Sequence, residues 1–120
     1  SSKVEKEYYA QVDGSITPED IQKLKNGVEI GFEGKKYTTL PCQAKLLDPK
    51  PLFPERSKKI RDERHGPTSW VSITLKEGKF RQVRKMTAAI GLPTLRLIRV
   101  RIGDIVLGNM HVGEVEKIDF

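Results

Sequence analysis

The chain has 120 residues, which is enough for one compact domain with one hydrophobic core or for part of a larger one. Its composition, 37% hydrophobic and 32% charged, is typical of a globular protein rather than a disordered one. No apolar run approaches the roughly 18 residues that a membrane span needs, and no apolar segment follows the charged N-terminus, so the sequence predicts neither a membrane helix nor a signal peptide.

Cysteine and histidine are scarce in this chain. A single cysteine, Cys42, excludes an internal disulfide, and with only two histidines beside it a structural zinc site is not expected. We therefore expect a soluble, cytoplasmic protein that is monomeric and holds no metal.

The net charge of +6 is concentrated in the middle of the sequence. Residues 1–55 carry 8 Lys or Arg against 9 Asp or Glu, residues 56–101 carry 13 against 3, and residues 102–120 carry 1 against 4. The middle segment alone thus has a net charge of +10. Such a concentration indicates a polyanionic partner, with nucleic acid as the default candidate. A solvated basic face without a partner is the alternative.

Short strand-forming stretches separated by turns predict an α+β fold, a mixed and mostly antiparallel sheet with two helices. Strands are expected over residues 7–13, 28–32, 37–40, 43–47, 69–75 and 95–102, with a final turn and strand over 105–115. The first helix is expected to begin after the cap Thr17, with Pro18 at its first position, and to end at Asn26 and Gly27. The second is expected over about residues 80–90, closed by Gly91.

Residues 49–67 interrupt this pattern with four prolines and a charged run. We expect a basic, proline-rich loop here, within a single unit that covers residues 1–120. Five cations fall within nine residues of this loop, and they include Lys58, Lys59 and Arg61. A segment of this kind suits ordering against an RNA groove, so we expect these three side chains to bind RNA.

The second helix carries cations beside an apolar stripe. Phe80, Val83, Thr87 and Ile90 recur at helical spacing and are expected to face the core, with Arg84 at the border of that stripe. The turn into the helix also presents backbone N–H groups, which favour a phosphate. Farther along, Arg99 and Arg101 should share one face of the last long strand. The expected RNA contacts in this region are Lys79, Arg81, Gln82, Lys85 and Arg99.

Several of these segments resemble one known family. Residues 77–86 (EGKFRQVRKM), followed by Gly-Leu-Pro at 91–93 and by residues 97–103, look like the C-terminal half of the RsuA-type pseudouridine synthases. Residues 6–12 are similar to the Lys-x-Tyr strand of the same family. Residues 67–70 and 93–99 look most like its RluE branch, which modifies large-subunit ribosomal RNA. The resemblance covers nearly the whole chain.

The resemblance implies an isomerase that converts uridine to pseudouridine in 23S ribosomal RNA without a cofactor. In this family an aspartate is the nucleophile, a tyrosine stacks on the flipped base and an arginine pairs with the aspartate. Carried over, Tyr8 is the stacking residue and Arg84 the arginine that keeps the nucleophile ionised. An aromatic face suits a flipped uracil, and a nearby cation lowers an aspartate's pKa.

One part of the family pattern is absent. The family's aspartate lies in a Gly-Arg-Leu-Asp motif upstream of the Lys-x-Tyr strand, and no aspartate of this chain follows Arg-Leu. Leu47-Asp48 is the pair most similar to the end of this motif, but the resemblance places it in a late strand rather than in the active site. We therefore expect the chain to be the C-terminal portion of a catalytic domain, inactive by itself. A non-enzymatic RNA-binding or ribosome-associated module and a domain that binds an acidic protein are the alternatives.

Overall fold

The computed structural model describes residues 4–48, 66–79 and 81–106. In chain order these form β1 (Lys6–Asp13), α1 (Pro18–Asn26), β2 (Glu29–Phe32), β3 (Lys35–Thr38), β4 (Gln43–Leu46), β5 (Thr68–Leu75), α2 (Gln82–Ala89), β6 (Thr94–Ile102) and β7 (Ile105–Val106). Most of the predicted boundaries agree with these to within two residues. The loop prediction falls on residues that are largely outside the described part, as does most of the predicted strand over 105–115.

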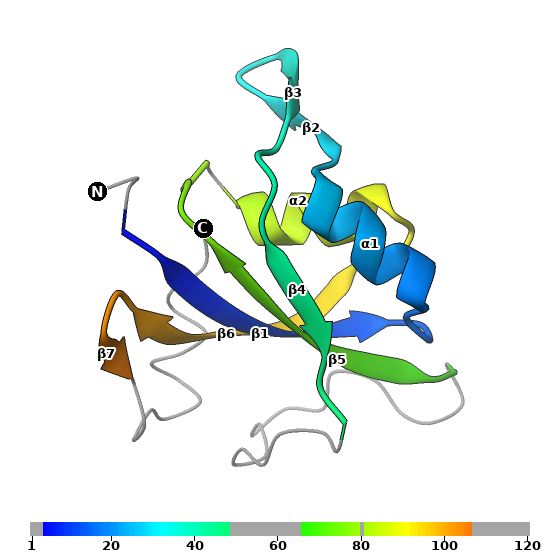
Figure 1. The fold of residues 1–120 in the computed structure, drawn as a ribbon. Helices are drawn as coiled ribbons and strands as arrows, with labels where there is room; N and C mark the ends of the chain where they lie inside the picture. The colour runs from blue at the N-terminus through cyan, green and yellow to red at the C-terminus, as the bar shows by residue number, and fades with distance from the viewer. Residues whose placement is uncertain (1–3, 49–65, 80, 107–120) are drawn as a thin grey trace.

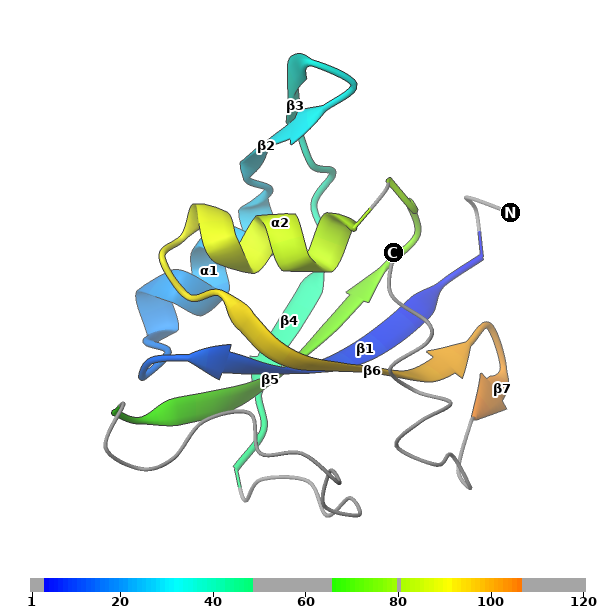
Figure 2. The ribbon, with the colours of Figure 1, turned by 180° about the vertical axis from the view of Figure 1, so that it is seen from behind.

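The strands form a sheet in the order β4-β5-β1-β6-β7, and β2 and β3 form a separate hairpin. Every pairing among the described strands is antiparallel. Both helices lie on one face of the sheet, as the front and back views show (Figures 1 and 2). The α+β prediction with two helices is therefore confirmed. No helix among the residues described is long and apolar enough to cross a membrane.

The first helix begins as its sequence predicts. The Thr17 side chain accepts a hydrogen bond from the backbone N–H of Asp20 at 3.1 Å, and the Asp20 carboxylate accepts one from the Thr17 N–H at 3.0 Å. This reciprocal capping box satisfies two backbone donors that the first turn leaves unpaired. The helix ends at Gly27, whose φ of 103° and close approach to the Thr39 carbonyl leave no room for a side chain.

The alternation of β5 separates two clusters of buried side chains. Val71, Ile73 and Leu75 face the helices and join the main core with side chains of β1, both helices and β6. Trp70 faces the other way and packs with Ile98 in a smaller cluster. The alternation in the sequence predicted this division, because successive strand residues point to opposite faces.

A bulge separates two arginines that the sequence predicted to share a face. Tyr8 pairs with Arg99 and Glu7 with Arg101, and the register shifts between these two pairs. Arg101 instead points toward Glu7 and bonds the carboxylates of Glu5 at 2.9 Å and Glu7 at 3.2 Å. The prediction of a shared face was wrong because one extra residue in a strand reverses the alternation beyond it.

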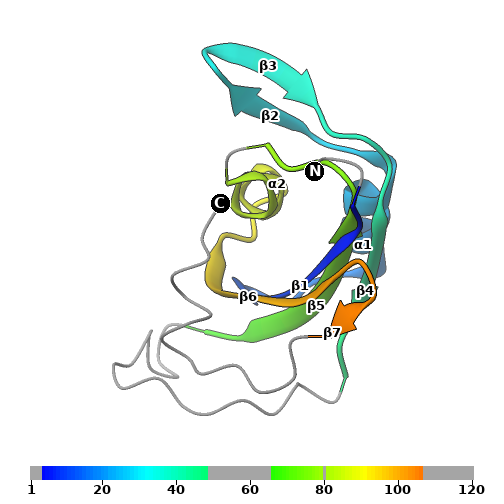
Figure 3. The same ribbon diagram turned by 90° about the vertical axis from the view of Figure 1, so that its left-hand side faces the viewer.

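The sheet curves around α2, and the β2–β3 hairpin extends over the side of α2 that faces away from the sheet (Figure 3). Lys85 Nζ donates a hydrogen bond to the Gly31 carbonyl of this hairpin at 2.9 Å. The N-terminal end of α2 therefore lies between the sheet on one side and the hairpin on the other.

Candidate functional site

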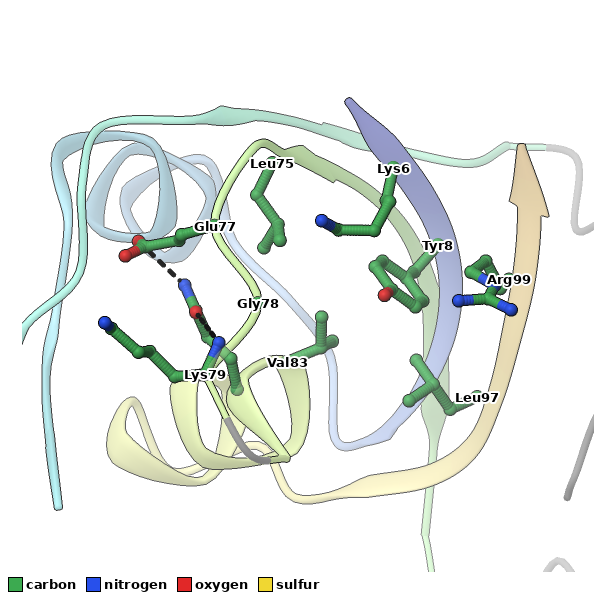
Figure 4. Close-up of a pocket in the computed structure, with 10 residues that line it drawn as sticks. Lys6, Tyr8, Leu75, Glu77, Gly78, Lys79, Val83, Leu97 and Arg99 are labelled. Carbon is green, nitrogen blue, oxygen red and sulfur yellow. Dashed lines mark hydrogen bonds between the residues drawn. The ribbon is translucent and has the colours of Figure 1, made fainter. Parts of the chain in front are cut away.

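A pocket opens between the sheet and the N-terminal end of α2. Its volume is about 280 Å³, and it is lined from β1, β5, α2, β6 and the turn that joins β5 to α2. Ten residues line it: Lys6, Tyr8, Leu75, Glu77, Gly78, Lys79, Gln82, Val83, Leu97 and Arg99 (Figure 4). This volume lies just below the roughly 300–1,000 Å³ of typical ligand sites, so the pocket suits a small ligand.

Tyr8 lies in the wall of this pocket. It is only 4% exposed and packs with the core, while its ring points into the pocket (Figure 4). Burial raises the pKa of the Tyr8 hydroxyl above its ordinary 10.0, against the opposing charge and hydrogen bond of Arg99. The hydroxyl therefore stays protonated at neutral pH, and the ring is held rigidly between β6 and the core.

Glu77 is a buried carboxylate that joins three segments at the edge of the pocket. It is 7% exposed and accepts hydrogen bonds from the Tyr37 hydroxyl, from the Leu40 N–H at 2.7 Å and from Gln82 Nε2 at 2.8 Å. These donors come from β3, from the segment that follows it and from α2. A buried charge is tolerated where such partners replace water, so Glu77 fixes the hairpin to the turn before α2.

Two lysines expected to bind RNA contact the hairpin. The Lys79 ammonium lies 5.0 Å from the ring centroids of both Phe32 and Tyr37, and Lys85 Nζ lies 6.0 Å from the Phe32 centroid. Cation–π contacts of this kind add to the Lys85 hydrogen bond with the hairpin backbone. Lys79 also lines the pocket, whereas Lys85 is not among its lining residues.

Gln82 was predicted to contact an RNA backbone, which requires an exposed side chain, but its side chain is buried. It is 3% exposed, and its amide both donates to Glu77 and accepts from the Lys79 N–H at 3.1 Å. Gln82 and Met86 are four residues apart on the helix and share a face that points inward, and Met86 is 0% exposed. This inward pair was not predicted, whereas Val83 and Thr87 are buried as predicted.

Arg81 and Arg84 lie at the start of α2. Arg81 is the N-cap and has a φ of 53°, a left-handed conformation that is uncommon for a residue with a side chain. Arg84 is half-buried and donates a hydrogen bond to the Thr94 carbonyl at 3.4 Å. The described lining of the pocket includes its neighbour Val83 but not Arg84 itself.

The remaining predicted residues divide between two groups. Arg99 lines the pocket next to Tyr8, as its register with β1 requires. Lys58, Lys59 and Arg61 lie outside the described residues. Phe80, which was expected to face the core, lies outside them as well.

Two charged residues of the pocket, Lys6 and Glu77, were not among the predicted site residues. Lys6 is two residues before Tyr8 on the same strand, so the alternation that placed Tyr8 also placed Lys6 on that face. Glu77 could not be found in this way, because its environment depends on the hairpin folding back onto α2. Within the described ranges, no group of three or more histidine, cysteine or acidic side chains could hold a metal ion.

Comparison with known proteins shows the family. Residues 1–89 match the family model described as RNA pseudouridylate synthase. The chain belongs to this family. A solved structure described as the crystal structure of pseudouridylate synthase is similar, with a TM-score of 0.63 and 26% identity over 87% of this chain and 36% of that one. The fold prediction and the resemblance to RsuA-type pseudouridine synthases are thus both confirmed.

Two similar proteins act, by their names, on the large ribosomal subunit. Ribosomal large subunit pseudouridine synthase E of Vibrio parahaemolyticus is 44% identical over 98% of this chain, and the protein of the same name from Xanthomonas axonopodis is 44% identical over 82%. The chain spans 47% and 50% of these two proteins. It therefore spans about half the length of the curated relatives it matches.

Proposed function

We propose that the protein to which this pocket belongs converts uridine to pseudouridine in large-subunit ribosomal RNA, in the cytoplasm and without a cofactor. The observation that carries the proposal is the match to ribosomal large subunit pseudouridine synthase E over 98% of the chain. The pocket supports it, because a buried aromatic ring, an apolar floor and cations together suit a nucleotide turned out of an RNA helix.

In this proposal Tyr8 contacts the flipped uracil through its ring. Its position between the core and Arg99 limits its motion, so little conformational entropy is lost when the base binds. Leu75, Val83 and Leu97 form an apolar surface around it. Removal of water by such a surface strengthens any charge interaction made in the pocket.

Arg84 is proposed to pair with the aspartate nucleophile. A guanidinium close to a carboxylate lowers its pKa, so the carboxylate remains ionised even where water is excluded. Arg84 is half-buried beside the pocket residue Val83, a location from which its side chain can reach a group at the pocket edge. Arg84 donates a hydrogen bond to the Thr94 carbonyl at 3.4 Å, and a guanidinium carries five N–H donors in a planar fork that matches a carboxylate.

The nucleophile itself is proposed to lie outside these 120 residues. The aspartates of the chain are Asp13, Asp20, Asp48, Asp62, Asp104 and Asp119, and none follows Arg-Leu. Asp20 is engaged in the cap of α1, and neither Asp13 nor Asp48 lines the pocket. We therefore propose that the purified 120-residue chain forms no pseudouridine in ribosomal RNA.

The test is to map pseudouridines in ribosomal RNA from cells that lack the intact gene. One large-subunit position should lose its pseudouridine and regain it with the intact gene. Tyr8→Ala or Arg84→Met should fail to restore it, with a rate lower by at least ~100-fold, as expected when a key electrostatic or stacking contact is lost. Lys23→Ala, an exposed change on α1, is the matched control.

An unchanged pseudouridine map would contradict the proposal. If the protein still bound ribosomal RNA, that result would favour the non-enzymatic RNA-binding module instead. Pseudouridine formation by the 120-residue chain alone would refute the separate proposal that the nucleophile lies outside it.

A further inference from the structure

A bulge interrupts the pairing of β1 with β6 at the level of Tyr8. Glu7 pairs with Arg101. The next residue of β1, Tyr8, pairs with Arg99, so the pairing with β1 passes over Val100. A bulge re-aims the side chains beside it, and here Arg99 faces the pocket while Arg101 points toward Glu7 on the other face. The wall of the pocket at Tyr8 therefore depends on how the two strands are held at this bulge.

One guanidinium, that of Arg101, holds the strands together next to the bulge. Its Nη2 donates a hydrogen bond to the Glu5 carboxylate at 2.9 Å, and its Nε donates one to the Glu7 carboxylate at 3.2 Å. Its Nη1 donates to the Gly103 carbonyl at 2.8 Å, just beyond the end of β6. The other Glu7 oxygen accepts a hydrogen bond from the Ser72 hydroxyl on β5 at 2.7 Å. This network, which we call the Arg101 clamp, therefore connects β5, β1 and β6.

The structure gives β6 little other support at this level of the sheet. Among the described residues, β7 pairs with Arg101 and Ile102 and does not reach Arg99. The bulge itself interrupts the ladder of backbone hydrogen bonds between β1 and β6. Three hydrogen bonds from one planar guanidinium fix a geometry that a single flexible ion pair on a surface does not. We therefore expect the Arg101 clamp to determine how rigidly β6 is held against β1.

The pair of residues next to the clamp belongs to the pocket. Tyr8 and Arg99 lie beside one another in the pocket wall (Figure 4). Burial raises the pKa of Tyr8, and the charge of Arg99 and its hydrogen bond with the phenol oppose this effect. A displacement of Arg99 would therefore change both the support of the Tyr8 ring and the charge beside the base that this ring is proposed to contact.

We propose that Arg101 and Glu7 are positioning residues for the proposed reaction, which act by holding Tyr8 and Arg99 in place at the pocket. The inference rests on the proposed function, because it concerns the residues proposed to surround the flipped uridine. Neither Arg101 nor Glu7 lines the pocket, so their effect reaches the base through β1 and β6. The rival explanation is a direct contact of Arg101 with RNA, since Arg101 belongs to the positively charged segment 56–101.

Hydrogen exchange measures the positioning effect independently of activity. Arg101→Gln and Glu7→Gln are made in the intact protein, and deuterium uptake is followed in peptides that cover β1, β6 and α1. Both changes should speed exchange around Tyr8 and Arg99 by roughly fivefold or more, because the loss of charge-assisted hydrogen bonds makes local opening easier. Exchange in α1 should stay the same. Unchanged exchange in β1 and β6, or an equal increase in all peptides, overturns the proposal.

Kinetics with a ribosomal RNA fragment distinguish positioning from a contact with RNA. Loss of positioning should lower kcat by roughly tenfold in both variants and change KM by less than about twofold. The two substitutions remove charges of opposite sign, so a direct electrostatic effect on RNA would raise KM for Arg101→Gln and lower it for Glu7→Gln. Opposite changes of this kind, or an unchanged kcat in both variants, overturn the proposal.

Lys45→Gln and Glu19→Gln are the matched controls, because they remove one charge of each sign from exposed positions on β4 and α1. Both should leave kcat and the exchange of β1 and β6 unchanged, and an equal loss of kcat in these controls would contradict the positioning role. Circular dichroism confirms that each variant is folded. Failure of the proposed function is distinguishable, because the wild-type protein would then form no pseudouridine, whereas the hydrogen-exchange result would still test the clamp.

Discussion

Glu77 illustrates how a single side chain connects separate parts of this fold. Its carboxylate is almost fully buried, and it accepts hydrogen bonds from a phenol, a backbone amide and a side-chain amide. The hydrogen bond that it accepts from Tyr37 raises the pKa of that phenol to about 12, and burial and the charge of Glu77 add to the effect. The hairpin, the turn before α2 and α2 itself therefore depend on one group for their mutual arrangement.

We predict that Tyr37→Phe lowers the free energy of unfolding by about 1–3 kcal/mol at neutral pH, because a hydrogen bond to a charged group is lost. The pKa of Tyr37 is raised from 10.0 to about 12 in the folded protein. Its contribution to stability is therefore complete below pH 10 and is lost as the pH rises through about 12. Urea unfolding at neutral pH measures the first effect.

An ultraviolet absorbance titration of the phenols measures the second effect. The wild-type chain should show a transition near pH 12, and Tyr37→Phe should lack it. Tyr9→Phe removes a phenol that packs against the smaller cluster of Trp70 and Ile98, and it should leave that transition in place. A transition near pH 12 that persists in Tyr37→Phe would contradict the assignment.

Side-chain environments were the least predictable feature of the candidate site. Arg99 lines the pocket, but Lys79 also contacts aromatic rings of the hairpin, and Gln82 is buried. The sequence around residues 77–86 indicates cations near a helix start, and this is correct. It contains no information about Phe32 and Tyr37, which lie some 40 residues earlier in the chain and come into contact only in the folded protein.

Among the elements, α1 was the easiest to predict. Its cap, its proline, its acidic first turn and its terminal glycine are all local signals, and each makes the contact that the sequence implied. The β2–β3 hairpin was predicted as two strands, but its position over α2 was not. That position depends on contacts with Glu77, Lys79 and Lys85, all distant in sequence.

We predict that Thr17→Ala lowers the free energy of unfolding by about 1 kcal/mol, because the capping box loses its side-chain acceptor. Thermal or urea unfolding measures the change. Ser15→Ala, an exposed hydroxyl removal two residues before the cap, is the matched control and should have little effect. Equal effects of the two changes would contradict the prediction, because they would show that the capping hydrogen bond adds nothing to the free energy of unfolding.

At the scale of the whole molecule, folding decides which of the positive charges meet one another. Lys79 and Arg99 of the positively charged segment 56–101 line one pocket together with Lys6, which lies outside that segment. Other cations of this segment are engaged within the protein, as Arg101 is with Glu5 and Glu7. The total charge therefore overstates the number of cations that a partner would meet.

For the basic segment 55–65 we predict that Lys58, Lys59 and Arg61 replaced together by Ala weaken RNA binding and reduce its salt dependence. Loss of three phosphate contacts should lower the slope of log affinity against log salt by about 2 for single strands. Binding of a ribosomal RNA fragment at several salt concentrations measures this. Lys23, Lys25 and Lys45 replaced by Ala remove the same charge from exposed positions elsewhere, and an equal change there would contradict the prediction.

The sequence by itself determined the local structure and the family, because capping, alternation and the motif at residues 77–86 act over short distances along the chain. Only the tertiary structure decided which side chains meet at the pocket. The bulge in β6 separated Arg101 from Arg99, and the hairpin brought Tyr37 to Glu77. Both outcomes depend on pairing and packing between segments far apart in the chain, where no local pattern records the partner.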